Sequence, residues 1–121
     1  MLFRSGTSNG DTGLDTNSGT LSRLTKDASG NWVKVDLVYG LPRSEENHAV
    51  NGMQIDPATG HLLLAIGGNT NAGAPSQEFG YLSEYAYAAS VVDIDLAAID
   101  AMPSKTYRGQ TYKYEIGRAH V

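Results

Sequence analysis

The chain has 121 residues, with 14 glycines, no cysteine, and 9 basic against 13 acidic residues, for a net charge of −4. A chain of this length can bury the core of one domain, and its low charge content is typical of a folded protein. The basic residues are scattered, so no nucleic-acid partner is expected. The lack of cysteine excludes disulfides, a thiolate nucleophile and cysteine-ligated zinc. The longest apolar run, Leu62–Ile66, is too short to span a membrane, and no signal peptide is visible.

The first predicted element is a lead-in over 1–19, where Gly, Ser, Asn, Asp and Thr indicate a loop-rich segment. Short apolar or alternating runs then predict five strands, at 20–26, 32–39, 49–55, 61–67 and 90–96. The turn 27–31 contains Gly30, which can adopt a positive φ, so the first two strands are expected to form a hairpin. The second strand alternates strictly, and we expect Lys34 and Asp36 on its solvent-facing side.

In the second half, a tight turn is expected between the third and fourth strands, and a long loop of small residues follows over 67–80. A helical turn is expected over 81–89, because Tyr81 and Tyr85 are four residues apart and would share a helix face. A short helix is expected over 97–102, ended by the proline that follows. Short strands with tight turns predict an all-β fold. Their spacing fits a sandwich, a barrel or a propeller equally.

The C-terminal residues, EIGRAHV, differ in character from the rest of the chain. IGRAHV is the peptide that a common short-read sequencing adapter encodes in one reading frame. We therefore expect 1–114 to be the natural domain and 115–121 to be an adapter-derived tail, which is set aside in predicting fold and function. The alternative is a genuine polar tail.

One string of positions follows the second predicted strand: Gly-Leu-Pro ahead of His48, an apolar strand, a turn with Pro57 and Gly60, and a second apolar strand ending at Gly67. This string resembles one blade of the soluble quinoprotein glucose/sorbosone dehydrogenase-like family, which are six-bladed β-propellers. The resemblance implies a partial β-propeller of two to three blades of antiparallel strands, an incomplete fragment whose remaining blades lie elsewhere in a parent protein. Two family features are missing: a glycine pair after the histidine, and an acid after Gly67.

The resemblance also implies a site. In that family the histidine acts as a general base on a sugar hydroxyl while hydride passes to pyrroloquinoline quinone (PQQ), so His48 is the expected catalytic residue. The expected pocket residues are Arg43, Asn51, Asn69, Thr70 and Asn71. PQQ and calcium are expected by resemblance only, with loop carbonyls as possible calcium ligands. The family's quinone-anchoring basic residues come from other blades, so this chain alone is expected to be inactive. The parent protein is expected to be secreted or periplasmic.

Two alternatives stay open. His48 can instead be a loop residue that bonds only to backbone. The chain can also belong to a non-catalytic propeller module of a secreted or surface protein, which binds carbohydrate or protein through its loops. The missing acid after Gly67 and the long Asn/Thr/Gly loop motivate this second reading. His61, Asp93 and Asp95 are expected to be surface residues that face solvent.

Overall fold

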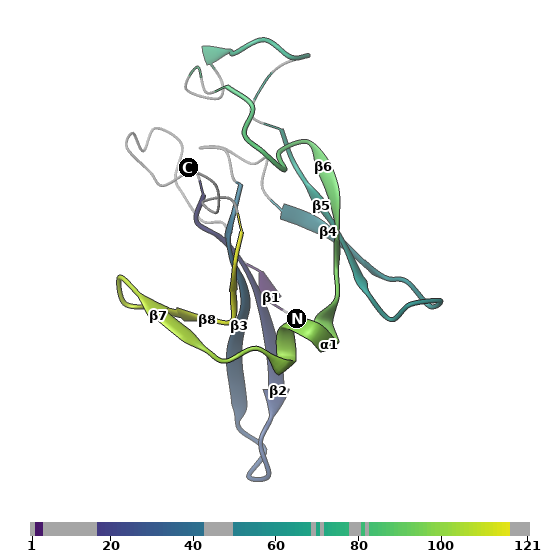
Figure 1. The fold of residues 1–121 in the computed structure, drawn as a ribbon, viewed down its shortest axis with the longest axis vertical. Helices are drawn as coiled ribbons and strands as arrows, with labels where there is room; N and C mark the ends of the chain where they lie inside the picture. Colours follow the sequence, from purple (N-terminus) through teal and green to yellow (C-terminus); the bar gives the residue numbers. More distant parts are fainter. Residues whose placement is uncertain are drawn as a thin grey trace.

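The computed structural model describes residues 2–3, 17–42, 50–68, 70, 72–77, 81 and 83–116 (Figure 1). These residues form an all-β fold, as predicted, with one short helix in the described part. The first sheet has the order β1-β2-β3-β9, with β1 (Leu2–Phe3), β2 (Gly19–Lys26), β3 (Trp32–Leu41) and β9 (Tyr114–Glu115). The second sheet has the order β4-β5-β6, with β4 (Val50–Ile55), β5 (Leu62–Ile66) and β6 (Ser90–Ile94). A separate hairpin contains β7 (Lys105–Tyr107) and β8 (Gln110–Tyr112).

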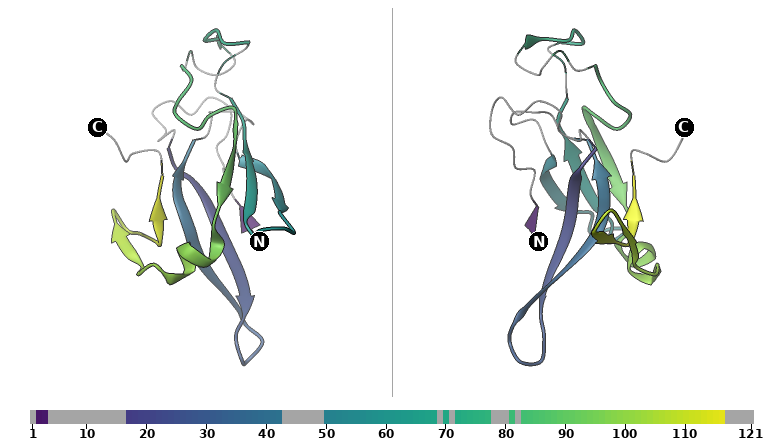
Figure 2. Two further views of the ribbon diagram at one scale, coloured as in Figure 1. Left: turned by 45° about the vertical axis from the view of Figure 1, so that its right-hand side comes forward. Right: turned by 90° about the vertical axis from the view of Figure 1, so that its left-hand side faces the viewer.

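The predicted hairpin is present as the antiparallel pair β2–β3, whose tip projects away from the rest of the molecule (Figures 1 and 2). Its turn is held by the Asp27 carboxylate, which accepts hydrogen bonds from the backbone N–H groups of Ser29 and Asn31, each at 2.9 Å. Gly30 has a φ of +83°, as the sequence predicts. The predicted buried face does not reach the tip, because Val33 lies on the projecting part and is 41% exposed.

The second sheet is an antiparallel meander in which each strand pairs with the next in sequence. Its first turn is held by the Asp56 carboxylate, which accepts hydrogen bonds from the Ala58 N–H at 2.9 Å and the Thr59 hydroxyl at 3.0 Å. These bonds, the Ala58 amide first, hold the pKa of Asp56 below its usual value. Gly60 closes the turn with a φ of +74°. The predicted tight turn is therefore confirmed.

The two sheets share one hydrophobic core. Its buried members are Leu21, Leu37, Val38 and Leu41 from the first sheet, Val50, Leu62, Leu64, Ile66 and Ile94 from the second, and Ile99 from the helix. Burying each of these side chains stabilises the fold by roughly 1.5–3 kcal/mol. Packing across the core therefore fixes the two sheets against each other.

Helix α1 (Leu96–Ala101) follows β6 directly and contributes Ile99 to the core. The predicted strand over 90–96 is shorter than expected, because Asp95 caps the helix: its carboxylate accepts a hydrogen bond from the Ala98 N–H at 2.9 Å. The helix ends before Pro103, as predicted. In the described residues no helix is long and apolar enough to cross a membrane.

Charged side chains tie the end of α1 to β2 and to the residue between β8 and β9. Arg23 of β2 forms an ion pair with Asp100, which raises the pKa of Arg23 and lowers the pKa of Asp100, in each case chiefly through the hydrogen bond between them. Lys113 donates hydrogen bonds from Nζ to the carbonyls of Asp100 and Met102, at 2.7 and 3.2 Å. These bonds satisfy carbonyl groups at the C-terminal end of the helix.

The predicted helical turn over 81–89 is wrong for the residues that the structure describes there. Tyr81, Tyr87 and Ala89 have φ values of 57°, 70° and 51°, which belong to the left-handed region. A right-handed helical turn requires negative φ at successive residues, so these positions interrupt it. The segment instead forms a hydrogen-bonded turn that leads into β6.

The hairpin β7–β8 was not predicted. Arg108 and Gly109, with φ values of 49° and 78°, form its two-residue turn, and two positive φ values in succession suit a tight hairpin. The hairpin packs on β3, where Gln110 Nε2 donates a hydrogen bond to Asp36 Oδ2 at 2.7 Å. The expectation that Asp36 faces solvent is therefore wrong: only 9% of its side chain is exposed.

Strand β9 places part of the expected tail in the first sheet. Tyr114 and Glu115 pair in parallel with β3, and the backbone N–H of Ile116 donates a hydrogen bond to the carbonyl of Tyr39 at 2.8 Å. The hydroxyl of Tyr112 donates to the Glu115 carboxylate at 2.8 Å, which raises the pKa of Tyr112. Residues 117–121 lie outside the described residues.

Candidate functional site

The residues predicted to form the site belong to segments that join the second sheet. Arg43, His48, Asn69 and Asn71 lie outside the described residues. Asn51 is the second residue of β4, but its side chain is not among those described. Thr70 is described and is partly buried. The roles assigned to these six residues stay predictions.

The ladder register shows which end of the second sheet these segments join. Val50 pairs with Ile66, and Ile66 pairs with Ser90, so β4 begins where β5 ends and β6 begins. We call this end the loop end. The chain enters it from 43–49 and leaves it into 67–89, so the predicted histidine and the predicted Asn/Thr loop connect to the same end of one sheet.

An acidic side chain lies at the loop end. A Cβ atom added to Gly68 would lie 3.1 Å from the carboxylate oxygen Oε2 of Glu84, so that carboxylate lies directly against the Gly68 backbone. The carbonyl of Gly67 accepts a hydrogen bond from the backbone N–H of Ala89 at 3.1 Å, which brings the end of the long loop back to β5. The resemblance to the quinoprotein family implies an acid directly after Gly67, and Glu84 lies nearby from a different segment. No spacing pattern in the sequence indicates this.

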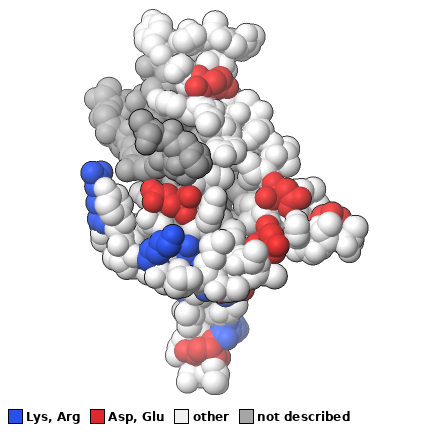
Figure 3. Space-filling view, in the orientation of Figure 1, with Lys and Arg blue, Asp and Glu red and all other residues white. Residues whose placement is uncertain are grey.

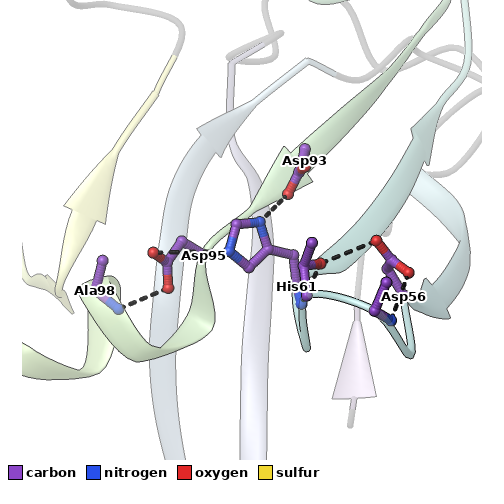
Figure 4. A network of polar contacts seen from close by, with 7 residues as sticks. Asp56, His61, Asp93, Asp95 and Ala98 are labelled. Atoms are coloured by element: carbon purple, nitrogen blue, oxygen red, sulfur yellow. Dashed lines mark hydrogen bonds and ion pairs between the residues drawn. The ribbon is translucent and has the colours of Figure 1, made fainter.

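The opposite end of the second sheet, which we call the turn end, carries a His–Asp cluster (Figure 4). His61 Nδ1 lies 2.7 Å from Asp93 Oδ1, and His61 Nε2 lies 3.8 Å from Asp95 Oδ2. The three side chains are 33%, 59% and 50% exposed, so the expectation of surface residues holds. His61 contacts both aspartates, however, and the sequence analysis does not predict these contacts.

The cluster is best explained as a structural link. Both ring nitrogens of His61 face carboxylates, and Asp95 also caps α1 through its bond to the Ala98 N–H. The ring therefore connects the turn before β5 to β6 and to the helix. Pairing of β5 with β6 would have indicated this contact. Leu63 pairs with Asp93, and His61 lies two residues before Leu63, so His61 and Asp93 project from the same face of the sheet.

The described residues do not by themselves fit the expected cofactors. Within them, no group of three or more His, Cys, Asp or Glu side chains is placed to hold a metal ion. Their Lys and Arg residues are at positions 23, 26, 34, 105, 108 and 113, which belong to the β2–β3 hairpin, to β7–β8 and to the segment that follows. On the face shown in Figure 3, blue side chains lie over these elements and away from the loop end. A carboxylate-bearing quinone therefore finds no described cation at the loop end.

Comparison with known proteins adds no relative: no family model, no curated protein and no solved structure matches the chain. The resemblance to the quinoprotein family therefore remains a hypothesis that rests on the residues of this chain. The same holds for every role assigned to a side chain at the loop end.

Proposed function

We propose that this chain is part of a soluble quinoprotein glucose/sorbosone dehydrogenase-like β-propeller, a secreted or periplasmic protein that oxidises a sugar hydroxyl. The second sheet would be one of its blades. The proposal rests on the loop end. The segment containing His48 and the segment containing 69–71 both join the second sheet at this end of its strands. In a propeller, loops from one end of each blade form the rim of a shared pocket.

The apolar face of the second sheet supports a blade that packs against a neighbouring sheet. That face carries Leu62, Leu64 and Ile66, all buried against the first sheet. The other face is mixed, because Val91, which is 67% exposed, lies on the same side of β6 as Asp93. Packing of one sheet face on another layer is the arrangement that a blade needs.

In this proposal His48 accepts the proton of the sugar hydroxyl, a role suited to a neutral imidazole. Arg43 and Asn51 would orient the sugar, and the loop residues 69–71 would line the pocket. Because the described residues do not fit PQQ or calcium, groups from other parts of the parent protein would have to bind them. The chain alone is therefore expected to be inactive.

The missing acid after Gly67 and the long Asn/Thr/Gly loop favour a second candidate function. In it the parent protein is a non-catalytic propeller that binds carbohydrate or protein through the same loops. Such a module needs no quinone and no proton acceptor, and it uses the Asn/Thr loop only for hydrogen bonds.

Two measurements on the parent protein separate these functions. The first is sugar-dependent reduction of an artificial dye in the presence of PQQ and Ca²⁺. The second is equilibrium dialysis against PQQ. Dye reduction together with quinone binding supports the dehydrogenase. A parent protein that neither binds quinone nor reduces the dye contradicts the dehydrogenase and supports the binding module.

A further inference from the structure

A polar groove lies between β3 and the β7–β8 hairpin, on the first sheet and away from the proposed catalytic end. Its volume is about 410 Å³, within the roughly 300–1,000 Å³ range of small-molecule sites. Its polar lining comes from three segments: Lys34 and Asp36 of β3, Ser104 ahead of β7, and Gln110, Thr111 and Tyr112 of β8. Figure 1 shows the hairpin standing beside β3, at the left of the view.

One of the groups that line the groove is the Asp36 carboxylate, which three other side chains hold in place. Its Oδ1 accepts hydrogen bonds from the Ser22 hydroxyl at 2.6 Å and lies 3.0 Å from Lys34 Nζ, and its Oδ2 accepts from Gln110 Nε2 at 2.7 Å. A carboxylate has about four acceptor sites, an ammonium three donors, and a Gln amide both a carbonyl oxygen and two N–H bonds. These contacts hold the Asp36 carboxylate, the Lys34 ammonium and the Gln110 amide in place. Each of the three can still form further hydrogen bonds, as donor or as acceptor, with a ligand. That combination suits hydroxyl groups, since each hydroxyl both donates and accepts.

The charge of the groove selects against ions. Lys34 and Asp36 carry opposite charges 3.0 Å apart, so their electrostatic fields largely cancel for a ligand that is farther away. An anion bound to Lys34 would lie beside the Asp36 carboxylate, and a cation bound to Asp36 would lie beside the Lys34 ammonium. A neutral ligand with several hydroxyls gains charge-assisted hydrogen bonds from both groups without either repulsion.

An aromatic residue of the same hairpin, Tyr107, lies outside the lining of the groove but beside one of its residues. Tyr107 pairs directly with Gln110 in the β7–β8 ladder, and directly paired residues project from the same face. The Gln110 side chain points to Asp36, so Tyr107 is on the hairpin face that looks toward the groove. The Arg108 guanidinium lies 5.2 Å from the centroid of the Tyr107 ring, and Tyr107 is still 47% exposed, so part of the ring surface remains for the apolar face of a sugar to pack on.

We propose that this groove binds a neutral monosaccharide or a neutral sugar unit of a glycan. Lys34, Asp36 and Gln110 would bond its hydroxyls, and Tyr107 would pack against its ring. The site is independent of the proposed sugar oxidation, because it uses β3 and β7–β8 and no residue of the loop end. It gives the chain a means of holding carbohydrate whether or not the parent protein is an enzyme.

The test is a titration of the ¹⁵N-labelled 121-residue chain, followed by two-dimensional NMR. The probes are glucose, galactose, mannose and N-acetylglucosamine, each up to about 50 mM to cover millimolar affinities. Saturable shifts are expected at the backbone amides of 34–36 and 104–112 for at least one of these sugars. Glucuronate and glucosamine, which carry charges, are expected to bind more weakly than the neutral sugar of the same series.

Matched variants locate the site. Lys34→Ala and Tyr107→Ala are each expected to weaken binding about threefold or more. Lys26→Ala and Tyr81→Ala, which remove exposed side chains outside the groove, are expected to leave the dissociation constant unchanged. The proposal is overturned if no sugar gives a saturable shift, or if the shifts cluster at 66–70 and 84. It is also overturned if Lys34→Ala and Tyr107→Ala both bind like the unmodified chain. Dye reduction depends on the loop end and not on the groove, so either proposal can fail while the other holds.

Discussion

Replacing Asp36 with alanine is expected to loosen the β7–β8 hairpin from the first sheet. The change removes the acceptor of the Ser22 and Gln110 hydrogen bonds, and Ser22 is only 3% exposed. Hydrogen bonds to a charged group contribute roughly 1.5–3 kcal/mol each, and the partly exposed Lys34 pair adds at most about 1 kcal/mol. Gln110 is partly exposed, so water can replace part of the hydrogen bond that it loses. We therefore expect the free energy of unfolding to fall by about 3 kcal/mol, near the lower end of the summed contributions. For a chain of this length that lowers Tm by about 10 °C.

Thermal unfolding followed by circular dichroism at neutral pH measures this loss, and hydrogen exchange at 105–113 shows whether the hairpin is the part that opens. The matched control is Asp93→Ala. This residue also makes a short contact, 2.7 Å to His61, but its side chain is 59% exposed, and less than about 1 kcal/mol is expected. Equal Tm values, within about 2 °C, for Asp36→Ala and the unmodified chain would refute the view that this carboxylate holds the hairpin.

Three further changes test other parts of the structure. Leu64→Ala, at a fully buried position, should cost about 2–5 kcal/mol in urea unfolding, whereas Val91→Ala, 67% exposed, should be nearly neutral. The pKa of Tyr112 is raised chiefly by its hydrogen bond to Glu115, so this contribution to stability is complete below about pH 10 and is lost as pH rises through the folded pKa. Glu115→Gln should therefore lower the pKa of Tyr112 in an ultraviolet titration that uses Tyr112→Phe as reference; an unchanged pKa would contradict the contact. Gly40→Ala should lower Tm, because Gly40 has a φ of +83° and a Cβ there would collide with the Ile116 carbonyl; an unchanged Tm would contradict both the backbone conformation of Gly40 and the packing of Ile116 against it.

The strands that the sequence predicts are those whose patterns are local. The hairpin β2–β3 follows from alternating residues around Asp27 and Gly30, which supply their own turn chemistry. The turn after β4 follows in the same way from Asp56 and Gly60. Each of these signals lies within a few residues of the structure that it specifies.

Features that depend on distant contacts were missed. The β7–β8 turn is Arg108-Gly109, and it lacks the Asn-Gly or Asp-Gly pair that is typical of two-residue hairpin turns. The alternation of β3 predicts that Asp36 faces solvent, but the β7–β8 hairpin, which follows much later in the chain, covers it. The acid at the loop end comes from Glu84, whose place beside Gly68 depends on how the long loop returns to β6.

We propose that the loop end of the second sheet, and not its turn end, is the catalytic end of a sugar-oxidising protein. Turnover of sugar by the parent protein, with PQQ and Ca²⁺ present, tests it most directly when His48→Ala is compared with His61→Ala. His61 is the matched control, because it is a histidine of the same sheet at the turn end, bound to Asp93. We predict that His48→Ala lowers turnover by about 10²-fold or more while His61→Ala leaves it near the unmodified value. Equal turnover in the two variants would contradict the claim.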